Sequence, residues 1–361
     1  MKNKSHSITY IFDSERTSFE KIDIIIPELK EGEILVKNEY VTLCRSDINI
    51  YIGKRKEKNP TILGHEIVGR IVSFHKDANR NDLLNNELKV EDRITWGIYS
   101  SDPNSYYSQC GIPQKGDKLF KYGHEEVKAT DTLHGGLAEY IVLRKHTPII
   151  KLDEKIPLKI AATINCSVAT VSGAFRLAGN ISEKKILVVG VGMFGIVACA
   201  FAKSLKAKLV ASVDNNLVRL NESKLFGADI TYNSTVNNNE DVAKSFEKYD
   251  VVFDFSGVPN MMELSLKLLD LGGTAVWVGA MFPQREVKIS AEKLIRNIHT
   301  IKGLHNYNQE DLVTAIEFIN ENYQKYPFEN LVEDIFTLEE TKDAFKYAIS
   351  HNPYRVGIEI K

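Results

Sequence analysis

Three side chains of the kinds that bind transition metals lie in one short stretch of the sequence. Cys44 begins the run Cys-Arg-Ser-Asp, and His65 and Glu66 follow about twenty residues later in Gly-His-Glu. A thiolate, an imidazole and a carboxylate are ligand types that zinc prefers, and three protein ligands leave a fourth position for water or substrate. These three residues are therefore candidate zinc ligands.

Each candidate taken alone has a simpler interpretation, since a single cysteine is often a buried core thiol. Two further features favour a metal site. Ser46 and Asp47 follow Cys44 directly, which places a hydroxyl for proton transfer and a carboxylate partner for a ligating histidine beside the first ligand. Cys166, much later in the chain, offers a further thiol. We therefore predict a zinc site assembled from distant parts of the sequence.

Length and composition predict a two-domain protein and do not suggest a nucleic-acid or membrane partner. The 361 residues exceed one typical core, and 43% of them are apolar. A net charge of −2 argues against a nucleic-acid or membrane-surface partner. No uninterrupted apolar run reaches the roughly 18 residues of a membrane span, and no signal peptide is apparent. With four widely spaced cysteines, which suit a reducing compartment, we expect a cytoplasmic protein.

The first part of the chain has the pattern of a mainly β domain, which we place at residues 1–153. Short apolar runs alternate with turn signals over residues 8–41. Further strands are predicted for Ile67–Phe74, Arg93–Ile98 and Gly135–Leu143.

A nucleotide-binding pattern follows the β domain. A helix is predicted over Pro157–Gly179, and then a buried strand over Ile186–Val189 that runs directly into Gly-Val-Gly-Met-Phe-Gly. This G-x-G-x-x-G motif also opens an apolar helix, Ile196–Leu205, which is the context of a dinucleotide-binding turn. The backbone and the helix N-terminus would hold the pyrophosphate. The motif residues are Gly190, Gly192, Met193, Phe194 and Gly195.

The next predicted strand indicates which dinucleotide is bound. It ends in Asp214, 24 residues after Gly190, where a carboxylate can accept both ribose hydroxyls and would repel a 2′-phosphate. NAD is therefore expected rather than NADP. Arg219, one helical turn further, is a candidate contact to the ribose, and Gly279, after the strand Thr274–Val278, is expected to face the nicotinamide.

These strands complete an α/β domain that we place at residues 154–298. Beyond it the sequence predicts two helices, Asp311–Tyr323 and Glu339–Ser350, and a last strand, Val356–Ile360. We expect this tail, residues 299–361, to return to the first domain.

Together these motifs resemble the zinc-dependent medium-chain dehydrogenase/reductase superfamily of the alcohol dehydrogenase type, over nearly the whole chain. The resemblance implies an α/β protein in which a GroES-like catalytic domain is split by a Rossmann domain with a doubly wound parallel sheet, with the zinc between the domains. It implies the ligands Cys44, His65 and Cys166, with Glu66 beside the metal as an alternate ligand. By the same resemblance, Arg45 and Arg355 would bind the pyrophosphate, although a solvent-facing role is the alternative for both.

Two departures from the family pattern lead to expectations of their own. The four cysteines that hold a structural zinc in many members are replaced, so we expect one catalytic zinc, no structural zinc and a lobe stabilised by packing. Asn49 stands where many relatives have a proton-passing histidine, and an amide cannot titrate. The replaced cysteine positions are Asp102, Ser105, Ser108 and Gly116.

Two short motifs, Lys121–Glu125 and Asn165–Thr170, resemble a subgroup proposed to act in phosphonate metabolism. We therefore expect hydride transfer between NAD and a small polar alcohol or its carbonyl product, with a hydroxyalkylphosphonate as one candidate, for which Lys54, Arg55 or Lys121 would supply positive charge. A solvated basic loop is the alternative for these cations. A polyol, cyclitol or amino-alcohol dehydrogenase is the alternative enzyme, and a non-catalytic NAD(H)-binding protein is a rival of another class. The resemblance implies a homodimer or homotetramer.

Overall fold

The computed structural model describes residues 6–235 and 247–361, and the chain divides into two compact units. The units do not follow the predicted boundaries at residues 153 and 298. Residues 154–166 belong to unit 1, because helix α3 (Leu158–Thr163) packs on that unit's central strands. Unit 1 comprises Met1–Cys166, Asn308–Val313 and Phe328–Lys361, and unit 2 comprises Ser167–Tyr307 and Thr314–Pro327.

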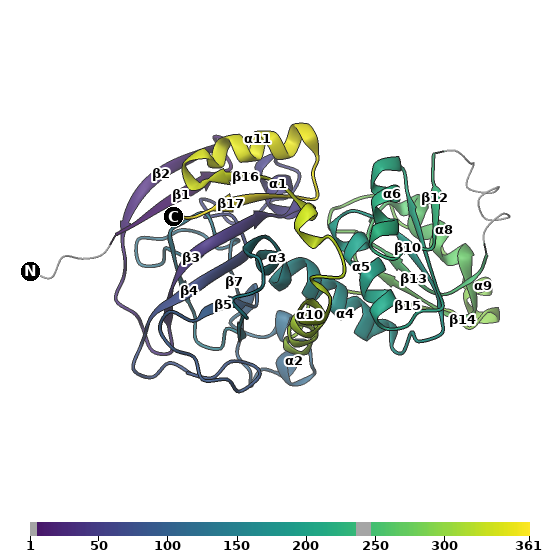
Figure 1. The fold of residues 1–361 in the computed structure, drawn as a ribbon, viewed down its shortest axis with the longest axis horizontal. Coiled ribbons are helices and arrows are strands. Elements are labelled where there is room, and N and C mark those ends of the chain that lie inside the picture. The colour runs from purple at the N-terminus through teal and green to yellow at the C-terminus, as the bar shows by residue number, and fades with distance from the viewer. Residues whose placement is uncertain (1–5, 236–246) are drawn as a thin grey trace, which may run out of the picture. The chain divides into compact units, whose positions relative to one another are not determined.

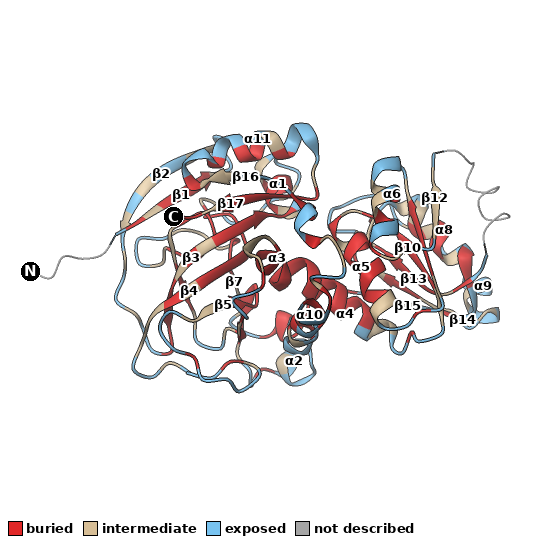
Figure 2. Cartoon of the chain, in the orientation of Figure 1, coloured by how far each residue is buried: buried red, intermediate tan, exposed pale blue. Residues whose placement is uncertain are grey.

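Unit 1 is built on a mixed seven-stranded sheet in the order β16-β17-β3-β4-β5-β9, with β8 also paired to β3 (Figure 1). Its inner strands are largely buried (Figure 2). Two smaller sheets, β1-β2 and β6-β7, complete the unit. The strands are β1 (His6–Asp13), β2 (Ser18–Ile25), β3 (Ile34–Leu43), β4 (Glu66–Phe74), β5 (Arg93–Trp96), β6 (Tyr99–Ser100), β7 (Phe120–Lys121), β8 (Tyr140–Leu143), β9 (Ile149–Lys151), β16 (Val332–Thr337) and β17 (Arg355–Glu359).

The C-terminal helix of unit 1 fastens the end of the chain to its beginning. Helix α11 (Thr341–His351) lies along β16 and β17 and also contacts α1 (Arg45–Tyr51) (Figure 1). The ring of Phe345 on α11 lies 4.9 Å from the rings of both Phe19 and Tyr51, centroid to centroid. Phe345 is fully buried, which stabilises this attachment by about 1.5–3 kcal/mol, and the half-buried rings of Phe19 and Tyr51 contribute less.

Unit 2 contains a six-stranded, fully parallel sheet in the order β12-β11-β10-β13-β14-β15 (Figure 1). In chain order this is 3-2-1-4-5-6, the arrangement of doubly wound dinucleotide-binding sheets, in which the ligand binds where the strand order reverses. That reversal falls between β10 and β13. The strands are β10 (Lys185–Val189), β11 (Leu209–Asp214), β12 (Ile230–Asn233), β13 (Tyr249–Asp254), β14 (Leu269–Trp277) and β15 (Thr300–Gly303).

Helices connect these strands. The apolar residues predicted to form a helix after the glycine motif do so in α5, which is almost entirely buried. The remaining helices are α2 (Tyr106–Gln109), α4 (Ala169–Ala178), α5 (Met193–Ser204), α6 (Leu217–Leu225), α8 (Pro259–Leu268), α9 (Ala291–Arg296) and α10 (Gln309–Asn322), with 3-10 turns η1 (Pro113–Lys115), η3 (Phe328–Leu331) and η4 (Leu338–Glu340).

The single helix predicted over Pro157–Gly179 is interrupted by a π-helical turn. This turn, Ile164–Val168, separates α3 from α4 and contains Cys166. Such turns are frequent at functional sites because they rotate one side chain out of the regular helical pattern. The whole segment Leu158–Ala178 is long and apolar enough to cross a membrane, but 89% of its most apolar window is buried inside the protein, as in a core helix.

Hydrogen bonds between serines hold the surface lobe formed by residues 102–117. Ser108 Oγ donates to the Asp102 carbonyl at 2.7 Å and lies 2.9 Å from Ser105 Oγ, which in turn accepts the Asp117 N–H at 3.1 Å. A Cβ on Gly116 would lie only 2.4 Å from Ser108 Oγ. The four positions expected to replace structural-zinc cysteines therefore converge in space, and hydroxyl hydrogen bonds, rather than packing alone, connect them.

We predict that Ser108→Ala loosens this lobe. Loss of its two hydrogen bonds, each contributing about 1 kcal/mol, should speed amide hydrogen exchange in residues 102–117 roughly tenfold. Gln109→Ala, an exposed change on the same helix, should leave exchange unaltered. Slower exchange of the wild-type lobe on addition of zinc would contradict the expectation that no metal binds there.

Candidate metal and nucleotide sites

Pairing between β3 and β4 brings the first two candidate ligands together. Cys44 follows the last residue of β3 and precedes α1, while His65 precedes the first residue of β4. The two strands are antiparallel with Thr42 opposite Glu66, so the end of one strand meets the start of the other. Both side chains are buried. Two residues that lie 21 positions apart in the sequence thus become neighbours through strand register.

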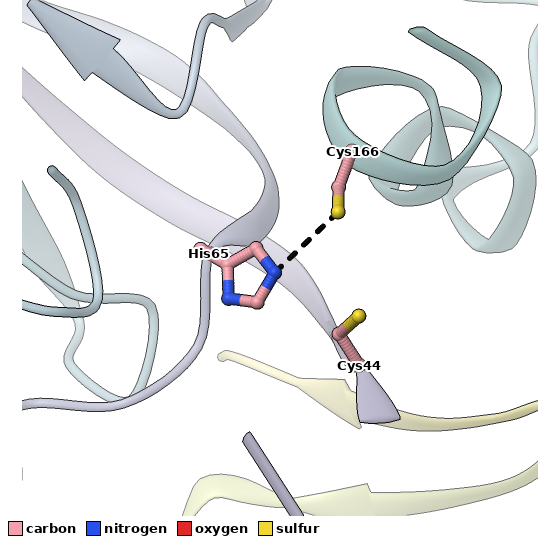
Figure 3. A group of neighbouring side chains, drawn as sticks. All are labelled: Cys44, His65 and Cys166. Carbon is pink, nitrogen blue, oxygen red and sulfur yellow. Dashed lines mark hydrogen bonds between the residues drawn. The ribbon is translucent and has the colours of Figure 1, made fainter. Parts of the chain in front are cut away.

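The third candidate ligand comes from the π-helical turn. Asn165 Nδ2 donates to the His65 carbonyl at 3.0 Å and to the Trp96 carbonyl at 2.9 Å, which fixes this turn against the strands. Cys166 Sγ then lies 3.5 Å from His65 Nε2 (Figure 3). The sequence alone gave Asn165 no role. Its signal was only its position next to the expected ligand.

The geometry of these three residues fits zinc. The Cys44, His65 and Cys166 ligand atoms all lie within 4.8 Å of one another. Two ligands bonded to tetrahedral zinc at about 2.3 Å (sulfur) and about 2.05 Å (nitrogen) are separated by roughly 3.5 Å, which matches the observed sulfur-to-nitrogen distance. No other group of three such residues is found within residues 6–235 and 247–361.

The carboxylate of Asp47 holds two of the three candidate ligands. Its Oδ2 accepts the backbone N–H of Cys44 at 2.9 Å, and its Oδ1 accepts the N–H of Gly64 at 3.1 Å and lies 3.3 Å from His65 Nδ1. Asp47 itself is fully buried. A carboxylate on the second nitrogen fixes the orientation and tautomer of the imidazole, so that Nε2 faces the two sulfurs. Ser46 Oγ lies 3.4 Å from that same nitrogen.

The charges around Cys44, His65 and Cys166 favour one ionised thiol rather than two. A hydrogen bond with Cys166, together with the positive charges of Arg355 and His65, holds the pKa of Cys44 well below its ordinary value. The pKa of Cys166 is raised because Cys44 and burial both disfavour a second negative charge. Burial opposes charge on His65, but Asp47 and Cys44 together outweigh it and raise the pKa. Bound zinc would allow both cysteines to be thiolates and the histidine to be neutral, because these are the forms that bind the metal.

Glu66 and Arg355 form a buried ion pair beside Cys44. Arg355 Nε and Nη2 donate to the two Glu66 oxygens at 2.6 and 2.8 Å, and Thr42 Oγ1 donates to Glu66 at 2.6 Å. Arg355 Nη2 also lies 3.5 Å from Cys44 Sγ. The Arg355 guanidinium is buried in unit 1 against Glu66, so it is not solvent-facing, and its role toward a pyrophosphate stays a prediction. Glu66 is outside the group of three ligands, and its role as an alternate ligand also stays a prediction.

The glycine motif of unit 2 has the close contacts that its spacing predicts. Gly190 has φ +85°, and a Cβ there would lie 2.8 Å from the Ser256 nitrogen. A Cβ on Gly195 would lie 2.0 Å from the Gly190 carbonyl oxygen, so only glycine permits this approach. Gly192 caps α5, of which Met193 and Phe194 form the first turn.

Asp214 ends β11 beside this turn. Its Oδ2 accepts the Val191 N–H at 2.8 Å, so the carboxylate already orders the glycine loop before any ribose is bound. The guanidinium of Arg219 lies 3.9 Å from the Cβ position of Gly192. Gly279 follows β14 in a tight turn against Gly257, and Arg45 is exposed at the start of α1 in unit 1. The roles of these residues toward a nucleotide stay predictions.

Comparison with known families places the chain in a class. Residues 30–154 match the family described as alcohol dehydrogenase GroES-like domain, and residues 193–321 match the family described as zinc-binding dehydrogenase. The chain therefore belongs to the zinc-binding alcohol dehydrogenases of the medium-chain type and is an oxidoreductase. The predicted α/β fold, with a GroES-like domain and a parallel Rossmann-type sheet, is confirmed.

Particular relatives are polyol and alcohol dehydrogenases. Sorbitol dehydrogenase 1 of Saccharomyces cerevisiae is 29% identical over 346 residues, 90% of each chain. D-arabitol-phosphate dehydrogenase of Enterococcus avium is 24% identical and covers 94% of this chain and 93% of its own length. A crystal structure of an alcohol dehydrogenase from Thermotoga maritima superposes with a TM-score of 0.92 at 24% identity, covering 99% and 100% of the two chains, which shows the shared fold.

We predict that Asp47→Asn weakens zinc binding. An amide keeps the shape of the side chain but removes the charge that orients His65, which should lower zinc affinity by about 10–100-fold in chelator competition. Asp23→Asn, an exposed carboxylate change in the same unit, serves as control and should leave the affinity unchanged. Equal affinity in Asp47→Asn and wild type would mean that Asp47 does not support the ligands.

We also predict that Arg355→Met is strongly destabilising. It leaves Glu66 buried without its partner, which should lower the free energy of unfolding by about 3–5 kcal/mol in urea titrations. Combining it with Glu66→Leu should lose much less than the two single changes added together. Arg296→Met, which breaks an exposed pair with Glu292, should cost under about 1 kcal/mol. A large fall in NADH affinity with unchanged stability would instead support the pyrophosphate role.

Proposed function

We propose that this protein is a zinc-dependent, NAD-linked dehydrogenase that interconverts a small polar alcohol and its carbonyl product. The observation that carries the proposal is the convergence of the Cys44, His65 and Cys166 ligand atoms within 4.8 Å, with the His65–Cys166 spacing of tetrahedral zinc. A non-catalytic NAD(H)-binding protein is the rival. It has no need for buried ligands oriented by a shared carboxylate.

Residues of unit 1 orient a metal ligand and accept the substrate proton. When bound, zinc supplies Lewis-acid polarisation of the substrate oxygen and NAD supplies the hydride acceptor. Asp47 keeps His65 oriented, and Ser46, whose hydroxyl lies 3.4 Å from His65 Nε2, accepts the proton that leaves the substrate hydroxyl. Asn49 is buried one helical turn further and cannot titrate, so its side chain would not carry the proton onward from Ser46.

NAD is proposed over NADP because of the end of β11. Asp214 places a carboxylate where an adenosine ribose would lie, and a 2′-phosphate there would be repelled. The following residues, Asn215 and Asn216, bring no positive charge, and the Asn216 side chain caps α6 instead. Arg219 remains the nearest cation on that helix and is proposed to contact the ribose.

We propose a narrower class of substrates than the family as a whole accepts. Relatives are named for sorbitol and for D-arabitol phosphate. Polar alcohols with and without an anionic group are therefore both candidate substrates. The resemblance of two short motifs to the phosphonate subgroup makes a hydroxyalkylphosphonate one candidate. Polyols, cyclitols and amino alcohols are the second candidates because they use the same metal site.

The proposed function predicts that a panel of these alcohols contains substrates that reduce NAD. Zinc content is quantified in the same preparation, so that inactivity and metal loss are separated. Turnover with NAD should exceed turnover with NADP. Absence of NAD reduction by every alcohol, with zinc bound, would contradict the proposal.

Removal of one ligand should abolish both metal binding and turnover. Cys44→Ser or His65→Ala leaves only two of the three ligands, so bound zinc and activity should fall to background while NADH binding, followed by its fluorescence, is largely retained. Cys110→Ser makes the same chemical change at an exposed cysteine and should alter neither. Full activity of a metal-free preparation would refute the zinc-dependent mechanism.

A further inference from the structure

Asp254 places a buried carboxylate at the end of β13, beside the point where the strand order of unit 2 reverses. Its side chain is fully buried, and burial raises its pKa to about 6. The carboxylate is therefore ionised at neutral pH in a place that disfavours its charge. A buried charge lowers stability unless other groups bind it, so a carboxylate at a ligand-binding edge calls for an explanation.

The carboxylate holds the turn that follows β13. Its Oδ1 accepts the Gly257 N–H at 2.8 Å, and its Oδ2 accepts the hydroxyl of Ser256 at 3.0 Å. Ser256 Oγ in turn accepts the Val258 N–H at 3.1 Å, directly before α8 begins. Each carboxylate oxygen thus has a donor of its own, and both donors belong to the same turn.

This turn is in tight contact with two loops that are expected to hold the dinucleotide. A Cβ on Gly190, the first glycine of the motif, would lie 2.8 Å from the Ser256 nitrogen. Gly257 has φ +62°, and a Cβ there would lie 2.3 Å from the Gly279 carbonyl oxygen. The Gly279 N–H also donates to the Asp254 carbonyl at 3.2 Å. Because neither contact leaves space, a shift of the turn would move the loop at Gly190, the loop at Gly279 or both.

Asp254 is not half of an ion pair. The residues opposite it on the neighbouring strands are Val189 on β10 and Trp277 on β14. Burial raises its pKa and the hydrogen bonds of the turn lower it, while no charged group of β10, β14 or α8 contributes within the described part of the chain. Ordering of the turn is therefore the role that its contacts support.

We propose that Asp254 is a positioning residue for the dinucleotide, because its carboxylate fixes the Ser256–Gly257 turn between the loops at Gly190 and Gly279. Since Asp254 is fully buried, it acts through the turn rather than by touching the cofactor. The proposal rests on the proposed function, in which these loops bind NAD. The ionised form is required because it offers one acceptor oxygen to each donor, whereas an amide has one for both and a protonated carboxyl has a hydroxyl in place of one.

The test compares Asp254→Asn with Asp250→Asn, the same change at the opposite end of β13, where the carboxylate accepts the Lys185 N–H at 2.7 Å. The amide keeps the shape of Asp254 but leaves one of its two donors without an acceptor. NADH affinity of the zinc-loaded protein, measured by fluorescence titration at about pH 8, should fall about five- to tenfold in Asp254→Asn. It should be unchanged in Asp250→Asn.

The pH dependence separates a positioning role from a structural one. Protonation removes an acceptor, so the NADH affinity of the wild type, relative to Asp254→Asn, should fall as the pH decreases through about 6. Stability should move in the opposite direction, because a carboxyl whose pKa is raised by burial destabilises the fold when it is ionised. The free energy of unfolding of the wild type, relative to Asp254→Asn, should therefore rise between about pH 7 and about pH 5.

Ser256→Ala perturbs the same turn from the other side and can be measured if Asp254→Asn does not fold. It removes the hydroxyl that the carboxylate accepts, so NADH affinity should again fall severalfold. Combined with Asp254→Asn it should cost little more than either change alone, since both act on one hydrogen-bonded group. Additive losses would contradict this coupling.

Two results overturn the positioning role: equal NADH affinity of the wild type and Asp254→Asn, or affinity and stability that change in the same direction with pH. If alcohols reduce NAD but Asp254→Asn binds NADH like the wild type, this inference alone fails. If NADH affinity depends on Asp254 but no alcohol reduces NAD, the proposed function alone fails.

Discussion

The candidate metal site depends on the single buried carboxylate of Asp47. It accepts the Cys44 and Gly64 N–H groups and lies against His65 Nδ1, so one side chain ties the end of β3 to the start of β4. A buried carboxylate is stable only when its oxygens are this fully used. Because three bonds converge on it, movement of Asp47 would misplace two ligands together. The order of residues in Cys-Arg-Ser-Asp is thus a geometric requirement, since it puts this carboxylate one helical turn after the first thiol.

Sequence reasoning found the ligand candidates but not their surroundings. Cys44, His65 and Cys166 are recognisable because few residue types bind zinc and the neighbouring serine and aspartate limit the choice. The ion pair of Arg355 with Glu66 was not foreseen, because the two residues lie 289 positions apart and only the pairing of β17 with β3 and of β3 with β4 brings them together.

The fold was predictable to a similar extent. The glycine motif and its flanking strand and helix specify unit 2 locally, so β10, α5 and β11 lie close to their expected bounds. Apolar periodicity cannot distinguish a continuous helix from one with a π-helical turn, and this turn around Cys166 was missed. The strand expected over Gly135–Leu143 shortens to β8 (Tyr140–Leu143), because Gly135 packs its backbone against Ile62. Such close backbone contacts depend on tertiary structure.

The central claim is that two thiolates and one imidazole of unit 1 hold a single zinc ion. X-ray absorption at the zinc edge, on protein of measured metal content, tests it most directly. The account predicts one zinc per chain, with two sulfur neighbours at about 2.3 Å and nitrogen or oxygen neighbours at about 2.0–2.1 Å. A shell of four sulfurs, a sulfur-free shell, or purified active protein without zinc would contradict it.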